Sequence, residues 1–108
     1  RLHGNYGEEM AKKTPDCSHL LKAIADPTRM AVLQVLMTRG PRTVTELNRK
    51  VRVELSLLSH HLRILRTAGV VDNLREGKSI RYRIADTVRG SLRKEALDLG
   101  CCSISFSR

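Results

Sequence analysis

The chain has 108 residues, a formal charge of +9, no tryptophan and only one Phe and two Tyr. This length is enough for one small domain with a core of Leu, Ile, Val, Ala and Met. Because a core with so few aromatic residues is thin for a monomer, we expect a homodimer that buries further apolar surface. No apolar run of about 18 residues exists, which excludes a membrane span. The polar N-terminus predicts no signal peptide, which favours a cytoplasmic protein whose cysteines start as thiols.

The positive charge is concentrated in one half of the chain. Residues 49–94 hold 12 Lys and Arg against 4 Asp and Glu. Such an excess favours a polyanionic partner, with nucleic acid as the leading candidate. A membrane surface is less favoured, because no predicted helix combines a basic face with exposed aromatic anchors.

The first half of the chain predicts two helices after an irregular arm. Residues 1–15 have no periodicity and predict a flexible arm, and since Met10 is a candidate natural start, part of this arm is a candidate cloning remnant. Asp16 is the predicted N-cap of a helix over 17–25. Asp26 and Pro27 then have the residue types of an N-cap and a first helical position, which predicts a second helix over 27–38.

The middle of the chain predicts a helix-turn-helix arrangement. Thr43 and Glu46 have the spacing of a capping box at the start of a short helix over 44–50, and a brief turn over 51–53 leads into a longer helix that Gly69 ends. In the longer helix, apolar residues recur at i, i+4 and i+7, which predicts one buried face. These residues are Leu58, Leu62 and Leu65, and the opposite face carries Ser56, Ser59, His60, Arg63 and Arg66.

The last third predicts a hairpin and a final helix. Ile80, Tyr82 and Ile84 alternate with Arg81 and Arg83, which is the period of a half-buried strand, and the turn around Gly77 completes a β-hairpin. Asp86 is the predicted N-cap of a helix over 87–99. The apolar stripe of that helix would consist of Val88, Leu92, Ala96 and Leu99, with Gly100 as its C-cap.

Four segments together resemble the ArsR/SmtB family of winged helix-turn-helix transcriptional repressors. They are residues 25–29 (ADPTR), 59–66 (SHHLRILR), 68–71 (AGVV) and 75–84 (REGKSIRYRI). The resemblance covers roughly residues 20–84 and implies a mostly α fold with a small β-hairpin (α+β). In that fold four helices are followed by two strands and a last helix over residues 16–100, and residues 101–108 form a tail that contains cysteines.

The resemblance also implies a homodimer that pairs through its first and last helices on a near-palindromic double-stranded DNA operator and leaves when an inducer binds. The expected interface residues are Leu20, Leu21, Ile24, Val88, Leu92, Ala96 and Leu99. The expected DNA-binding residues are Ser56, Ser59, His60, Arg63, Arg75, Lys78 and Arg81.

These DNA-binding residues have different expected roles. Arg63 is the best candidate for base recognition, because arginine on guanine is the commonest specific contact. Serines more often bind phosphates. We interpret His61 as a packed structural histidine, and Arg83, Arg89, Arg93 and Lys94 as a solvated cationic surface.

The family's two familiar metal patterns are missing. Thr43-Val44-Thr45 stands where the arsenic type has Cys-Val-Cys, and Asp86-Thr87-Val88 with no later histidine replaces the zinc type's Asp-x-His and His-x-x-Glu. Cys17, Cys101 and Cys102 remain, and the resemblance would bring Cys17 of one subunit near the other two. Three thiolates suit As(III) or Sb(III) as inducer. With His19, a Zn²⁺ or Cd²⁺ site is a less favoured option.

Two other interpretations of the cysteines stay open. They could form a redox or sulfur-species switch, or they could be inert apolar side chains. Among the wider function classes, an enzyme is not expected, since the sequence has no HExxH, nucleophile elbow or phosphate-binding glycine loop. A winged-helix protein-interaction module is the remaining rival.

Overall fold

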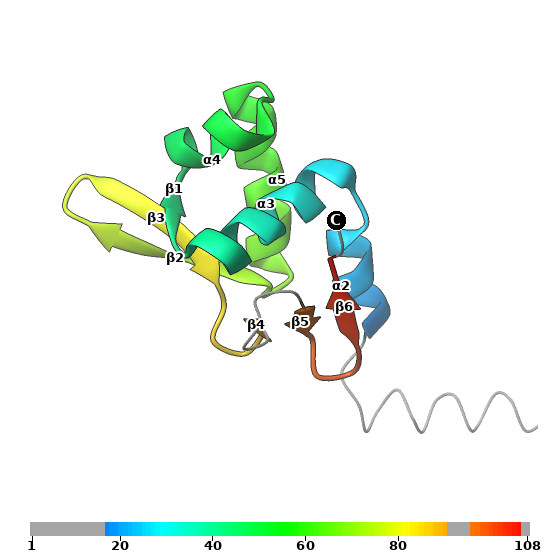
Figure 1. Cartoon of the computed structure of the whole chain (residues 1–108). Coiled ribbons are helices and arrows are strands. Elements are labelled where there is room, and N and C mark those ends of the chain that lie inside the picture. Colours follow the sequence, from blue (N-terminus) through cyan, green and yellow to red (C-terminus); the bar gives the residue numbers. More distant parts are fainter. Residues whose placement is uncertain (1–16, 91–95, 107–108) are drawn as a thin grey trace, which may run out of the picture.

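The computed structural model describes residues 17–90 and 96–106. Within these ranges, four helices come first, interrupted by a two-residue strand, and two small sheets follow (Figure 1). The helices are α2 (Cys17–Ile24), α3 (Pro27–Arg39), α4 (Val44–Val51) and α5 (Leu55–Thr67). The strands are β1 (Arg42–Thr43), β2 (Val71–Glu76), β3 (Ser79–Ile84), β4 (Arg89–Gly90), β5 (Ala96–Asp98) and β6 (Ser103–Ser105).

Two helix starts predicted from side-chain capping are confirmed, those of α3 and α4. The Asp26 carboxylate accepts hydrogen bonds from the backbone N–H groups of Thr28 and Arg29, at 2.9 and 3.0 Å, and Pro27 is the first residue of α3. The capping box of α4 is complete, because Thr43 and Glu46 each bond to the other's backbone N–H. Asp16, the predicted cap of α2, lies outside the described residues.

The core joins one face of each long helix. Leu33 and Leu36 of α3 pack with Leu58, Leu62 and Leu65 of α5, and all five side chains are buried. Full burial of a leucine is worth about 1.5–3 kcal/mol, so these contacts fix how α5 is held. The opposite face of α5 is thereby directed outward.

The predicted hairpin is confirmed as β2 and β3, which pair antiparallel from Val71 opposite Ile84 to Glu76 opposite Ser79. Gly77 begins the two-residue turn with a φ of 63°, a left-handed conformation that glycine adopts without strain. Strand β1 pairs with the other edge of β3, which gives the sheet order β1-β3-β2. The hairpin projects away from the helices as a wing (Figure 1).

The predicted last helix over 87–99 is wrong in its described part. The chain turns after Asp86 and forms β4, and β5 pairs antiparallel with β4 and with β6. The apolar residues here fit the period of a strand as well as that of a helix. Leu97 and Leu99 are buried on either side of exposed Asp98, which is the alternation of a strand. Gly100 has a φ of 91° between β5 and β6, so it belongs to a turn between strands and does not cap a helix.

The residues expected at the dimer interface differ in how far their own chain buries them. Val88 and Leu99 are buried in the core of their own chain, as is Ile24, and Leu92 lies outside the described residues. Leu20 and Ala96 are half-buried, and Leu21 remains 40% exposed. Within the described ranges, no helix is long and apolar enough to cross a membrane.

Candidate nucleic-acid interface and cysteine cluster

Helix α5 presents the polar face that its sequence predicts. Leu58, Leu62 and Leu65 are buried. The side chains predicted to face DNA, namely Ser56, Ser59, His60 and Arg63, are all exposed. The turn before α5 is fixed by Arg52, in the left-handed conformation at a φ of 56°, and by a hydrogen bond that the Asn48 side chain donates to the Val53 carbonyl. These contacts set α5 at a defined angle to α4.

His61 anchors α5 to the helix pair behind it. Its side chain is buried, as expected for a structural histidine. Arg29 Nη1 lies 3.0 Å from His61 Nδ1, and because guanidinium can only donate, Nδ1 accepts. Arg29 also donates to the Ala23 carbonyl, and Asp26 Oδ2 lies 3.9 Å from His61 Nδ1. Arg29 and Asp26 therefore hold the inner side of α5 in place. The outer side of α5 is the candidate contact surface.

Two exposed leucines in the first turn of α5 were not singled out from the sequence. Leu55 is 54% exposed and Leu57 is 43% exposed. The sequence does indicate their exposure, because neither fits the i, i+4, i+7 stripe of the buried face. Glu54 precedes them as N-cap residue but makes no side-chain capping bond.

The cations of the wing differ in whether they form ion pairs with carboxylates. Arg81 donates from Nε to Glu76 at 3.0 Å, and its Nη1 lies 3.5 Å from Glu46. Arg75 and Lys78 are exposed, and no ion pair joins either one to another residue of the described ranges. Of the three wing cations predicted to bind DNA, these two are thus the more available.

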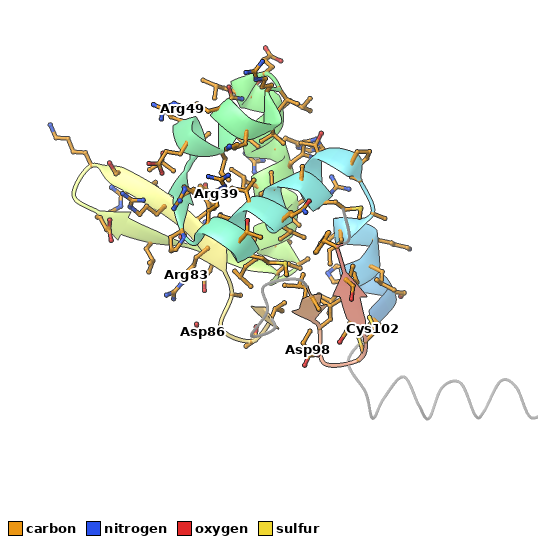
Figure 2. The ribbon with its side chains drawn as sticks, viewed as in Figure 1. Arg39, Arg49, Arg83, Asp86, Asp98 and Cys102 are labelled. Atoms are coloured by element: carbon orange, nitrogen blue, oxygen red, sulfur yellow. A yellow bond between two sulfur atoms is a disulfide. The ribbon has the colours of Figure 1, made fainter. Side chains whose placement is uncertain are left out.

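Arg83 lies at the base of the wing, where Figure 2 labels it near Asp86. Its Nε donates to Asp72 Oδ1 at 2.8 Å, and its Nη2 lies 3.9 Å from Asp86. The hydrogen bond to Asp72 raises the pKa of the Arg83 guanidinium above its already high ordinary value. Arg83 is therefore a cation that is already neutralised by its own chain.

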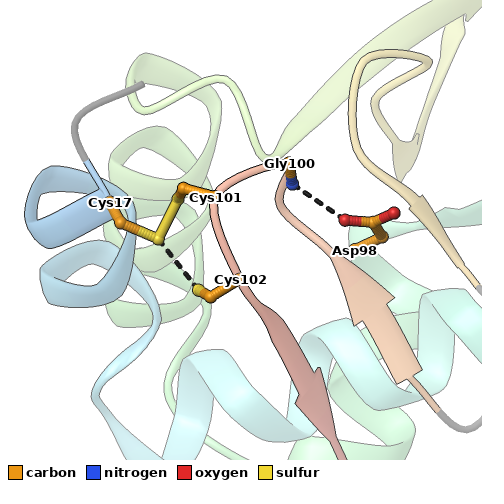
Figure 3. Close-up of a disulfide and its surroundings, with 5 residues drawn as sticks. All are labelled: Cys17, Asp98, Gly100, Cys101 and Cys102. Atoms are coloured by element: carbon orange, nitrogen blue, oxygen red, sulfur yellow. Dashed lines mark hydrogen bonds between the residues drawn. A yellow bond between two sulfur atoms is a disulfide. The ribbon is translucent and has the colours of Figure 1, made fainter. Parts of the chain in front are cut away.

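The three cysteines lie together, and Cys102 marks their position on the side of the molecule away from the wing (Figure 2). Figure 3 shows Cys17 at the start of α2 joined by a disulfide to Cys101 in the turn between β5 and β6. Cys102 Sγ lies 2.8 Å from Cys17 Sγ, and all three sulfur atoms lie within 4.8 Å of one another. The three cysteines come together within one chain, whereas the family resemblance led us to expect Cys17 of one subunit near Cys101 and Cys102 of the other.

The loop that carries Cys101 and Cys102 is itself braced. The carboxylate of Asp98 accepts a hydrogen bond of 2.9 Å from the Gly100 backbone N–H (Figure 3). All three cysteines are half-buried and pack against the hydrophobic core. His19 does not belong to the cluster; it is exposed on α2 and faces a pocket toward α5.

The Asp26 cap predicts a pH-dependent contribution to stability. Hydrogen bonding from the Arg29 backbone N–H holds the pKa of the Asp26 carboxyl below its ordinary value. Because the folded pKa is lowered, this stability is present at neutral pH and is lost as the pH falls below about 4. Asp26→Ala should therefore lower the free energy of unfolding by about 0.5–2 kcal/mol at pH 7 in urea titrations.

The matched control is Asp26→Asn, which keeps a capping oxygen but cannot titrate. It should retain most of the stability at pH 7. The gap between wild type and Asp26→Ala should shrink in strong acid, and a gap of unchanged size there would exclude an ionised cap.

Comparison with known proteins by sequence supports a single family. A model of a helix-turn-helix domain matches residues 24–72, which contain α3, α4 and α5. The HTH-type transcriptional regulator NmtR of Mycobacterium tuberculosis is 42% identical over 77 residues, which cover 71% of this chain and 63% of NmtR. The chain spans 63 to 66% of the length of the first three curated relatives that it matches.

Comparison with solved structures gives the same answer. Mb0332 from Mycobacterium bovis, a homodimeric winged helix-turn-helix DNA-binding domain and possible ArsR-family regulator, matches with a TM-score of 0.60 and 32% identity over 64% of this chain and 63% of that one. The transcriptional repressor BigR from Xylella fastidiosa matches with a TM-score of 0.63 and 31% identity over 74% of this chain and 81% of BigR. With its sequence motifs, its helix-turn-helix and its wing, the chain belongs to the ArsR/SmtB family of winged helix-turn-helix transcriptional repressors.

Proposed function

We propose that the chain is a homodimeric repressor that binds a near-palindromic DNA operator through α5 and the wing, and that an inducer releases it. The observation that carries this proposal is the exposed face of Ser56, Ser59, His60 and Arg63 on a helix whose other face is buried. A helix of that kind fits the major groove, and two copies would occupy half-sites about 34 Å apart. The family and its homodimeric DNA-binding member support the same arrangement.

Within this interface the side chains divide by chemistry. Arg63 is exposed and its planar guanidinium can bind guanine by two hydrogen bonds. Ser56 and Ser59 are short donors suited to phosphates, and Lys78 at the tip of the wing would contact the backbone beside the groove. Arg81 would have to leave Glu76 and Glu46 before it could contribute.

The proposed inducer is a thiophilic ion, As(III) or Sb(III), bound by Cys17, Cys101 and Cys102. Their sulfur atoms lie within 4.8 Å of one another, and an ion with bonds of about 2.3 Å would hold three sulfurs roughly 4 Å apart. The Cys17–Cys101 disulfide must open first: two molecules of a small thiol supply two electrons, form their own disulfide, and leave two protein thiols. Zn²⁺ or Cd²⁺ fits less well, because the cluster offers no fourth protein ligand among the described residues.

Helix α2 would link the cluster to DNA binding. Cys17 begins α2, and this short helix contacts α5. Near its other end, the Ala23 carbonyl accepts a hydrogen bond from Arg29, which also bonds to His61 of α5. Binding of an ion at one end of α2 can therefore change the position of α5 through a rigid element. Such a coupling is typically worth about 1–3 kcal/mol, or 5- to 150-fold in DNA affinity.

A second candidate is a thiol switch, favoured by the Cys17–Cys101 bond and the third sulfur beside it. Cys102 Sγ lies 2.8 Å from Cys17 Sγ, close enough for its thiolate to attack that atom. The attack would form a Cys17–Cys102 bond and release the Cys101 thiolate, with no net oxidation. In this candidate, oxidation of the thiols to a disulfide by a persulfide or another two-electron oxidant is the signal, two equivalents of a small thiol reverse it, and no ion is needed.

Titration of a preformed complex should separate the candidates. The reduced protein, bound to a duplex selected from a random library, would be titrated with arsenite, antimonite, Zn²⁺, Cd²⁺ and a persulfide, with fluorescence anisotropy as the readout. Arsenite or antimonite should weaken binding by about 5- to 150-fold. Selective release by the persulfide, or by oxidation alone, would support the switch.

Three Cys→Ser single variants complete this experiment. Each should lose most of the response to arsenite, because two thiolates hold the ion less tightly than three. If no additive releases the DNA and all three variants respond as wild type, both cysteine-based proposals are wrong. Equal failure to bind selected and random DNA would instead favour a protein-interaction module.

A further inference from the structure

A pocket separate from the cysteine cluster lies between α2 and α5. Its volume is about 310 Å³. Helix α2 contributes His19, Lys22 and Ala23 to its lining, and α5 and its last turn contribute Arg63, Ile64 and Ala68. A volume near 300 Å³ is at the lower end of the range of small-molecule sites.

The lining combines an apolar floor with a cationic rim. Ala23 is buried, and Ile64 and Ala68 are half-buried, so the deeper surface is made of methyl and methylene groups. Lys22 and Arg63 are exposed at the rim together with His19, and no carboxylate lines the pocket. The site is therefore complementary to a molecule with an apolar body and a negative head.

We propose that this pocket binds a small amphipathic carboxylate, whose apolar body lies on Ala23, Ile64 and Ala68 and whose head group is bound by Lys22 and Arg63. At about 30 Å³ for each non-hydrogen atom, the volume holds roughly ten such atoms. A carboxylate with a chain of about eight carbons fits this size. The head group gains charge-assisted hydrogen bonds that a neutral alcohol of the same length would not form with equal strength.

Arg63 links the pocket to DNA binding, because it lines the pocket and is also the proposed base contact. This step rests on the proposed function. The same guanidinium lies on the outward face of α5 and is the proposed contact to guanine. A carboxylate bound to it removes that contact, so ligand and operator compete. The pocket would then be a second input to the repressor, independent of the cysteines.

The test uses octanoate as the probe and the full chain without DNA. In two-dimensional amide NMR, octanoate should shift the signals of Ala23, Ile64 and Ala68 in a saturable manner. Octanol should bind about tenfold more weakly, because it lacks the charged head, and octylamine should bind more weakly still. Equal affinities for the three probes, or shifts spread over the whole protein, would overturn the proposal.

Two lysine variants provide the matched comparison. Lys22→Glu should weaken octanoate binding by about tenfold or more, since it replaces an attractive charge at the rim by a repulsive one. Lys50→Glu makes the same change on an exposed residue of α4 that does not line this pocket, and it should leave octanoate binding unchanged. Similar losses in both variants would show that octanoate responds only to overall charge.

Competition is measured separately, so that the two proposals can fail independently. Octanoate should lower the affinity for the selected duplex in wild type and much less in Lys22→Glu. If the NMR shifts occur and DNA affinity is unaffected, the competition is wrong. If no duplex binds in the absence of octanoate, the proposed function is wrong while the NMR result still decides the pocket.

Discussion

An increase in NaCl from about 50 to about 200 mM should weaken the binding of the protein to duplex DNA by about 10²-fold, because phosphate contacts release counterions. The estimate counts two phosphate-binding cations in each protomer, Arg75 and Lys78, because Arg63 is the proposed base contact. These two are exposed in the structure and make no ion pair within the described residues. Four contacts in a dimer correspond to a slope of about −3.6 in log affinity against log salt.

Single substitutions should resolve this slope into its parts. Lys78→Ala should reduce the magnitude of the slope by about 2 in a dimer, with similar losses of affinity on selected and random duplexes. Arg63→Ala should instead cost about 1–3 kcal/mol on the selected duplex and less on random DNA, if it binds a base. Anisotropy titrations at several salt concentrations measure both quantities.

Arg83→Ala is the matched control for these variants. It removes one cation from the wing, but that cation already donates to Asp72 at 2.8 Å. The slope of Arg83→Ala should equal that of wild type. A flat salt response in wild type, or an Arg83→Ala variant that loses as much slope as Lys78→Ala, would contradict the proposed interface.

The parts of this fold that could be predicted from sequence are those that local chemistry determines. Asp26, Thr43 and Glu46 act on backbone groups two or three residues away, so their capping bonds follow from the spacing alone. Gly77 and the alternation from Ile80 to Ile84 likewise specify the turn and the strand within one short segment. The exposed face of α5 follows from the burial of its leucines.

The last segment could not be predicted because its sequence satisfies two periodicities. Val88 and Leu99 fit a helical stripe, but Leu97, Leu99 and the residues around Gly100 also fit a pair of short strands. The choice depends on partners far along the chain: Leu97 and Leu99 join the core, and Cys101 bonds to Cys17 at a sequence separation of 84. Local patterns contain no information about such a contact.

The sequence also could not predict which wing cations are free of ion pairs and can therefore contact DNA. Arg75, Arg81 and Arg83 all belong to the hairpin, yet Arg81 pairs with Glu46 of α4 and Arg83 pairs with Asp72 on the facing strand β2, while Arg75 has no ion pair among the described residues. Glu46 accepts from the Thr43 backbone N–H, which lowers the pKa of its carboxyl, and the same carboxylate lies 3.5 Å from Arg81. A residue that caps α4 therefore also neutralises a wing cation.

Reduction of the Cys17–Cys101 disulfide should lower the free energy of unfolding by about 2–5 kcal/mol. The bond closes a loop between residues 84 apart, and a long loop loses much conformational entropy in the unfolded chain when it is closed. It also holds β5 and β6 near α2, so its loss should loosen the packing of Leu97 and Leu99. Urea unfolding with and without dithiothreitol measures the difference.

Cysteine variants distinguish the disulfide from a general effect of the reductant. Cys102→Ser retains the Cys17–Cys101 bond and should lose the same stability on reduction as wild type. Cys101→Ser should lose less than Cys17→Ser under oxidising conditions, because Cys102 Sγ lies 2.8 Å from Cys17 Sγ and can replace the missing partner. The double variant Cys101→Ser/Cys102→Ser has no partner left for Cys17 and should match reduced wild type. Equal stability of oxidised wild type and the double variant would show that the cysteines contribute nothing to folding, and a sensor built on them would then have to act without any change in the stability of the β5–β6 segment.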